Sequence, residues 1–205
     1  MASELEKWDD RWSRAGQWAG QEPCAFLVEA LPWLPRGDAL ELAIGGGRNA
    51  VFLAARGWQV TGLDQSAAAL AKTEELARQR GVAIAGGGPG IPKQPDARRG
   101  GSLRLVQADL ESTTLEPESC HALLCVNFLL RRLAQEMIGA LRPGGVLVYE
   151  TYTLDQLKYE GGPRNPEYLL RPGELREMFP SLETLFYREV SAGKGIASLL
   201  AHRPA

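Results

Sequence analysis

The stretch ALELAIGGGRNAVFLAARGWQVTGLDQS, residues 39–66, decides the fold. It contains an apolar run, three consecutive glycines, a helix-like apolar segment and a second apolar run that ends at Asp64. This pattern predicts a buried strand, a tight turn, a helix ended by Gly57 and a second buried strand. Alternation of strands and helices is typical of a parallel sheet covered by helices.

The rest of the chain continues the alternation. Helices are expected at 3–18, 23–32, 66–81, 131–141 and 173–179, with Ser66 as N-cap and Gly81 as C-cap of the third. Further strands are expected at 103–110, 121–130, 146–153, 182–190 and 195–203. Only SAGK separates the last two strands, so they should pair as a hairpin.

The predicted fold class is therefore α/β. We expect a Rossmann-like, doubly wound, mostly parallel seven-stranded sheet with an antiparallel C-terminal hairpin and an N-terminal helical cap over residues 1–35. A length of 205 residues suits a single domain over 1–205. Residues 85–102, AGGGPGIPKQPDARRGGS, are rich in Gly and Pro and are expected to form a flexible insertion.

Composition excludes several classes of protein. The net charge of −2 and the pI of about 5.8 lack the basic excess that nucleic-acid binding needs. No apolar run reaches the roughly 18 residues of a membrane helix, and the charged N-terminus is not a secretory signal. Three cysteines without a CxxC pair, and only two histidines, indicate buried thiols in a reducing cytoplasm and no metal site.

The glycine triplet indicates a ligand site at the end of the first strand. Gly45, Gly46 and Gly47 lack a Cβ, so a ligand can approach the backbone. Asp64, 19 residues after Gly45, ends the next strand, where a carboxylate can accept both ribose hydroxyls. This much suits a dinucleotide or S-adenosylmethionine, since Gly45-x-Gly47-x-x-Ala50 also fits the dinucleotide fingerprint.

Three features favour S-adenosylmethionine over NAD. Glu41 lies inside a buried strand, where it can orient the turn and hold the ligand's ammonium through water. Asp109 follows a later strand, where an adenine amino group would need an acceptor. The C-terminal hairpin is not required by the dinucleotide fold.

With these residues the chain resembles the class I S-adenosylmethionine-dependent methyltransferases, and within them the small bacterial tellurite-resistance type. The matching stretches are LELAIGGGRNAVFLAARGWQVTGLDQS, QADLE, VNFLLRRL, LRPGGVLVYETYT and RNPEYLLRPGEL. The resemblance implies S-adenosyl-L-methionine as cofactor and an N-terminal segment, with Trp8 and Trp12, that covers it. Together with the pattern above it implies these cofactor-binding residues: Glu41, Ala43, Gly45, Gly46, Gly47, Arg48, Asn49, Asp64, Gln65, Asp109, Leu110 and Asn127.

The methyl acceptor is expected to be a small molecule. Neither histidine falls at the carboxyl end of a strand, so no histidine base is evident and a soft or already anionic nucleophile is favoured. Candidates for acceptor contact are Arg131, Glu150, Tyr152, Arg164, Asn165 and Arg171, although the arginines could instead bind carbonyls of their own segment. Two alternatives stay open: a non-catalytic S-adenosylmethionine-binding module and an NAD-linked oxidoreductase.

Overall fold

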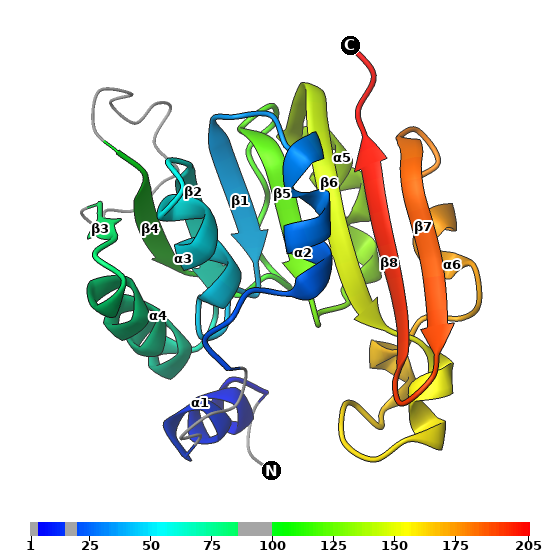
Figure 1. The fold of residues 1–205 in the computed structure, drawn as a ribbon. Coiled ribbons are helices and arrows are strands. Elements are labelled where there is room, and N and C mark those ends of the chain that lie inside the picture. The colour runs from blue at the N-terminus through cyan, green and yellow to red at the C-terminus, as the bar shows by residue number, and fades with distance from the viewer. Residues whose placement is uncertain (1–3, 15–19, 86–99) are drawn as a thin grey trace. The chain divides into compact units, whose positions relative to one another are not determined.

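The computed structural model describes residues 4–14, 20–85 and 100–205 (Figure 1). Contacts divide the chain into two compact units, one of Met1–Ala25 with Gly37–Thr113 and the other of Phe26–Arg36 with Thr114–Ala205. Among the described residues, every helix is too short or too polar to cross a bilayer.

The first unit is built on four parallel strands. They are β1 (Asp38–Leu42), β2 (Gln59–Asp64), β3 (Ala83–Ile84) and β4 (Ser102–Gln107), in the order β3-β4-β2-β1. Helices α3 (Arg48–Ala54) and α4 (Ala67–Gln79) cover the same face of these strands, as Figure 1 shows. Both helices contact β2 and β4, and their buried residues contribute to the core of this unit.

The strand register gathers the predicted ligand residues. Leu42 lies opposite Leu63, and the amide of Ile44 then donates to the carbonyl of Leu63. The turn after β1 therefore begins beside the end of β2, where Asp64 lies. Gln107 lies opposite Asp64 on the other side, so the carboxyl ends of β1, β2 and β4 meet at one edge.

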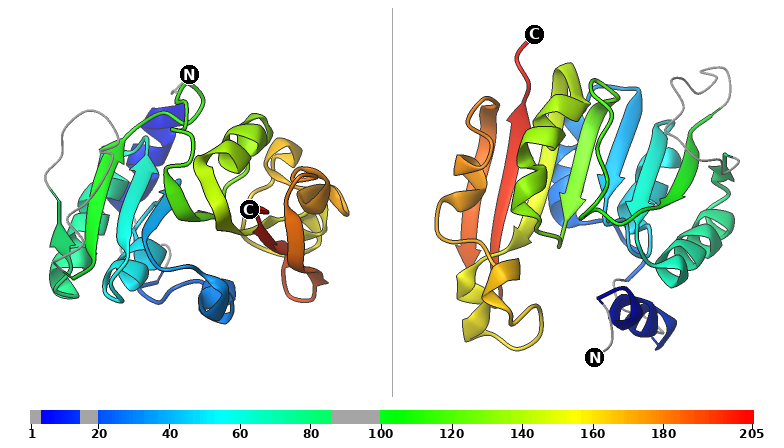
Figure 2. Two further views of the ribbon diagram at one scale, coloured as in Figure 1. Left: turned by 90° about the horizontal axis from the view of Figure 1, so that it is seen from above. Right: turned by 180° about the vertical axis from the view of Figure 1, so that it is seen from behind.

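The second unit contains β5 (Cys120–Val126), β6 (Leu141–Tyr152), β7 (Glu183–Ser191) and β8 (Gly195–His202), in the order β5-β6-β8-β7. β5 and β6 are parallel, whereas β8 is antiparallel to both β6 and β7. Helix α2 (Ala25–Ala30), continued by η1 (Leu31–Trp33), covers one face of these strands. Helices α5 (Ala134–Ala140) and α6 (Glu174–Glu177) cover the other (Figures 1 and 2).

Three short 3₁₀ segments complete the second unit. They are η2 (Arg131–Leu133) before α5, and η3 (Leu154–Lys158) and η4 (Pro166–Tyr168) between β6 and α6. The expected helix at 131–141 therefore begins as a 3₁₀ turn and becomes α-helical only at Ala134.

The predicted fold class is confirmed: a Rossmann-like, mostly parallel arrangement with an antiparallel C-terminal hairpin. The described residues hold eight strands where seven were expected. The additional strand is the short β3, Ala83–Ile84, which follows α4 and pairs with β4. Ser66 caps α4 by accepting from the Ala69 amide, as predicted. The C-cap is Arg80, and Gly81, predicted for that place, is the next residue, with φ +67°.

Two expectations about segments stay predictions. One is the cap over residues 1–35, of which the described residues up to Ala25 group with the first unit and 26–36 with the second. Of the expected insertion at 85–102, residues 86–99 lie outside the described residues. Gly101, at its end, packs so closely on the Ala54 carbonyl that no side chain would fit there.

Candidate functional site

The glycine turn of the first unit is held at Gly45, through hydrogen bonds to both the amide and the carbonyl of that residue. The Gly45 amide donates to Asp64 Oδ2 at 2.8 Å, and the Gly45 carbonyl accepts from Thr73 Oγ1 at 2.7 Å. Gly45 and Gly47 have φ of +56° and +75°, a conformation that favours glycine. The turn is therefore fixed to both the end of β2 and the middle of α4.

Neighbouring side chains leave no room for a Cβ at the three glycines. A Cβ on Gly45 would lie 2.7 Å from the Trp12 ring, and one on Gly46 would lie 3.3 Å from it. A Cβ on Gly47 would overlap the methyl group of Thr73. The glycines therefore give Trp12 and Thr73 room to pack, and that they also let a ligand approach the backbone stays a prediction.

Asp64 is a buried carboxylate that keeps acceptor capacity. Its Oδ1 accepts the Ser66 amide at 2.9 Å, while its Oδ2 accepts the Gly45 amide. Burial raises the pKa of the Asp64 carboxyl, and backbone hydrogen bonds from Ser66, Gly45 and Gln65 oppose that rise. A carboxylate has about four acceptor positions in all, so Asp64 keeps capacity for a ribose hydroxyl.

Glu41 is the most unusual group of the first unit. Its side chain is 2% exposed, and its Oε1 accepts from Asn49 Nδ2 at 2.8 Å. Its Oε2 is buried with no hydrogen-bond partner among the described residues. Burial raises the pKa of the Glu41 carboxyl to about 7, although the Asn49 amide and the Arg48 charge lower it. A carboxylate oxygen left in this state is suited to a cationic ligand group, which would stabilise its charge.

The Asn49 side chain links α3, on which it lies, to Glu41 of β1 and to Cys24. Besides donating to Glu41, its Oδ1 accepts the Cys24 amide at 2.8 Å, and its side chain is 3% exposed. Its amide is therefore used within the protein, and it bears on a ligand through Glu41.

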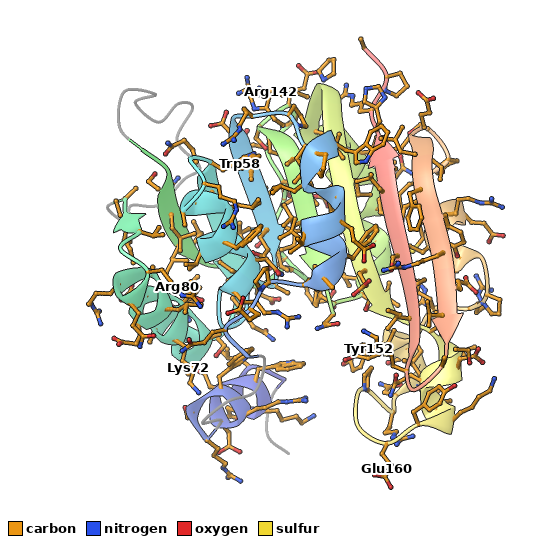
Figure 3. The ribbon with its side chains drawn as sticks, in the orientation of Figure 1. Trp58, Lys72, Arg80, Arg142, Tyr152 and Glu160 are labelled. Atoms are coloured by element: carbon orange, nitrogen blue, oxygen red, sulfur yellow. The ribbon has the colours of Figure 1, made fainter. Side chains whose placement is uncertain are left out.

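Helix α1 (Glu4–Arg14) is docked on the same turn. Asp9 Oδ1 accepts from Ser66 Oγ at 2.5 Å and from the Ala68 amide at 3.3 Å, at the start of α4. Trp12 lies against Gly45 and Gly46, with the Lys72 ammonium 6.0 Å from its ring centre. Figure 3 shows Lys72 on the part of α4 nearest to α1.

The other predicted residues of the first unit lie around this centre. Ala43 has φ +51°, an uncommon backbone conformation for a residue with a Cβ. Arg48 and Gln65 are half-buried, and Leu110 is buried. Asp109 is exposed, and its Oδ1 accepts the Glu111 amide at 2.9 Å. The Ala108 amide donates to the Asp64 carbonyl, which keeps this segment beside Asp64.

Three predicted residues of the second unit meet at the carboxyl ends of β5 and β6. Asn127 is exposed with φ +58°, and its amide donates to the Glu150 carbonyl at 2.8 Å. Glu150 is buried, and its Oε2 accepts from Ser198 Oγ at 2.6 Å. Tyr152 is half-buried at the end of β6, where Figure 3 labels it.

Arg131 forms a clamp within the second unit. Its guanidinium binds Glu174 through Nε (2.6 Å) and Nη2 (3.1 Å), and it donates to the carbonyls of Glu167 and Leu169. This guanidinium lowers the pKa of the Glu174 carboxyl to about 2. Arg131 thereby holds the segment between η4 and α6 against η2.

The remaining acceptor candidates also hold their own segment. Arg164 donates to the carbonyls of Leu157 at 3.1 Å and Tyr159 at 2.6 Å. Arg171 binds Glu174 through its amide and its guanidinium. Asn165 accepts the Glu167 amide at 3.1 Å and so caps η4. In this structure the three arginines use guanidinium donors on the protein itself.

Sequence reasoning missed Thr73, Asp9 and Glu174. A threonine inside a helix and an aspartate on an exposed helix carry no signal of a partner 28 or 57 residues away. Glu174 stands at the start of a helix after Gly173, which is a local signal of a capping acid.

A family model described as a methyltransferase domain matches residues 40–149, more than half of the chain. The chain belongs to this methyltransferase family. It is therefore a methyltransferase of the class I fold, and its cofactor is S-adenosyl-L-methionine. Family membership sets aside the NAD-linked oxidoreductase.

Solved structures share the fold at low sequence identity. One, reported for the conversion of a disulfide bond into a thioacetal group during echinomycin biosynthesis, has a TM-score of 0.72 and 18% identity. That match covers 98% of this chain and 93% of the other. TehB from Haemophilus influenzae has a TM-score of 0.69 and 16% identity, covering 96% of this chain and 67% of TehB. An S-adenosylmethionine-dependent methyltransferase from Methanosarcina mazei has a TM-score of 0.63 and 18% identity over 89% and 99%. No curated protein matches the chain.

Proposed function

We propose that this methyltransferase methylates a small molecule, and that the turn at Gly45–Gly47, with Glu41 and Asp64, holds its cofactor. The observation that carries the cofactor site is the buried Oε2 of Glu41, which lacks a partner within the described residues. An ammonium group would satisfy it, and the free acceptor positions of Asp64 would take the ribose hydroxyls.

When bound, S-adenosylmethionine supplies a methyl group already activated by its sulfonium, so this chain contributes mainly binding and orientation. Asp64 fixes the turn through Gly45 and leaves acceptor positions for a ribose. Asn49 holds Glu41 with one oxygen unpaired. Asp109, Leu110, Gln65 and Asn127 remain proposed contacts on the sequence pattern.

Helix α1 is the proposed cap of this site. Asp9 binds the start of α4 just after Asp64, and Trp12 covers Gly45 and Gly46. A cap in this position excludes water from the turn, which strengthens the interactions of Glu41 and Asp64 with a charged ligand.

A small, soft or already anionic acceptor suits the second unit best. Methyl transfer forms a bond from the nucleophile's electron pair to the methyl carbon while the sulfur–carbon pair returns to sulfur. A thiolate or an oxyanion of selenium or tellurium needs no base for this step. His121 lies at the start of β5. His202 lies at the end of β8, opposite Val146, where β6 begins to pair regularly with β5. Neither histidine therefore lies at the carboxyl ends of β5 and β6.

The acceptor contacts are proposed to come from Glu150 and Tyr152 and not from the arginines. Arg131, Arg164 and Arg171 bind Glu174 or backbone carbonyls, so an anionic acceptor would have to displace those bonds. The net charge of −2 argues against a nucleic-acid acceptor.

An acceptor screen tests this proposal. Purified protein is incubated with S-adenosylmethionine and, separately, thiols, selenite, tellurite, amines, phenols, bulk RNA and bulk protein, and S-adenosylhomocysteine is quantified. We expect product with a thiol or an oxyanion. Product with RNA or protein alone would reject a small-molecule acceptor, and cofactor binding without product from any class would support a binding module.

A further inference from the structure

We propose that Thr73 is a positioning residue for cofactor binding, because its hydroxyl fixes the Gly45–Gly46 peptide group. Thr73 lies in α4, two turns from the cap of that helix, and its side chain is fully buried. Its Oγ1 lies 2.7 Å from the Gly45 carbonyl oxygen and 3.2 Å from the Ala69 carbonyl oxygen. The hydroxyl has one proton, and the shorter distance assigns it to Gly45.

The hydrogen bond matters because of what Gly45 and Gly46 permit. Neither residue has a Cβ, so the peptide between them can rotate as a unit with little steric cost. The Gly45 amide is already held by Asp64, which leaves the next peptide group as the free joint of the turn. Thr73 removes that freedom.

When the Gly45 carbonyl is fixed, the direction of the Gly46 N–H is fixed with it. The peptide group is planar and trans, so the Gly46 N–H points away from the Gly45 carbonyl and hence away from Thr73. Within the part of the chain that the structure describes, this N–H has no hydrogen-bond partner. Thr73 thus presents a fixed backbone donor in the turn, beside the acceptors of Asp64.

Thr73 acts through the turn without touching a ligand itself. Its methyl group fills the space that a Cβ of Gly47 would need, and its hydroxyl reaches back to Gly45. The chain runs from Asp64 through Ser66 into α4, and Thr73 of that helix binds the same turn that Asp64 binds. Asp64 holds the Gly45 amide of this turn, and the Thr73 hydroxyl holds the peptide group that follows it.

The test separates the hydroxyl from the shape of the side chain. Thr73→Val keeps the shape and removes the donor, whereas Thr73→Ser keeps the donor. A third variant, Val60→Ala, weakens the core of the same unit from the buried start of β2, away from the turn. For each, titration calorimetry gives the Kd for S-adenosylhomocysteine and urea denaturation gives the stability.

We expect Thr73→Val to raise the Kd about tenfold and Thr73→Ser to keep it within about twofold of wild type. Val60→Ala should lower stability and leave the Kd unchanged. The inference is overturned if folded Thr73→Val binds like wild type, if Thr73→Ser is as weak as Thr73→Val, or if Val60→Ala loses as much affinity. The inference rests on the proposed cofactor site, and wild-type protein that fails to bind would reject both, whereas a failure confined to the Thr73 variants rejects this role alone.

Discussion

The buried carboxyl of Glu41 makes stability depend on pH in a way that one substitution removes. The pKa of this group is raised by burial from 4.5 to about 7. In the unfolded chain Glu41 loses its proton near pH 4.5, whereas the folded protein keeps it until about pH 7. Between these values the folded state binds more protons, so Glu41 makes stability fall as pH rises.

The size of this effect follows from the two pKa values. A change from 4.5 to about 7 corresponds to at most about 3 kcal/mol of unfolding free energy, absent below pH 4.5 and complete above pH 7. Glu41→Gln keeps the side-chain shape and the acceptor for Asn49 but cannot ionise. Above pH 7 we therefore expect the ligand-free variant to be more stable than wild type by about 1–3 kcal/mol.

Urea denaturation of both proteins from pH 4.5 to pH 8 measures this directly. The difference in unfolding free energy between variant and wild type should rise across pH 5–7, and other titrating groups cancel in it. Saturating S-adenosylhomocysteine should shrink the advantage of the variant at pH 8, because an ammonium group stabilises the Glu41 charge. A flat difference, or a variant that is less stable at pH 8, would refute the assignment of a buried carboxylate with one unpaired oxygen.

Three further outcomes are expected. Glu174→Gln should cost about 2 kcal/mol of stability above pH 5, because Arg131 lowers the pKa of the Glu174 carboxyl to about 2. In acid denaturation this loss should fade toward pH 2, and a pH-independent loss would contradict the prediction. Ala43→Gly should raise the melting temperature, since relief of φ +51° is worth about 1 kcal/mol more than the entropy that glycine loses; an unchanged or lower value counts against strain. Arg164→Ala should speed amide exchange in residues 157–164 and leave the Kd for S-adenosylhomocysteine unchanged; a parallel loss of affinity would show that this segment supports cofactor binding.

The existence and type of most strands, and the C-terminal hairpin, were accessible from the sequence because they rest on local patterns. Alternating apolar runs, the glycine triplet and the SAGK turn are all contiguous signals, and the structure has the expected elements at each. The short β3 was not predicted, since two exposed residues after Gly81 carry no apolar pattern.

The neighbours of the glycines could not be predicted from the sequence. The glycine spacing indicated a ligand turn, which stays a prediction, and the side chains that exclude a Cβ there, Trp12 and Thr73, come from two different helices. Likewise, Arg131 looked like a free cationic donor until Glu174, 43 residues later, was found beside it. Such pairs depend on tertiary packing, which a single sequence does not reveal.

Cofactor titration with an altered Asp64 tests the central claim most directly. Calorimetry should give micromolar affinity for S-adenosylmethionine and S-adenosylhomocysteine, and much weaker binding of NAD. Asp64→Ala should stay folded and lose about 1.5–3 kcal/mol of binding free energy, while Glu75→Ala, an exposed acid on α4 paired with Arg78, should bind like wild type. Equal or tighter binding of NAD, or an unchanged Kd in folded Asp64→Ala, would contradict a cofactor site at the glycine turn.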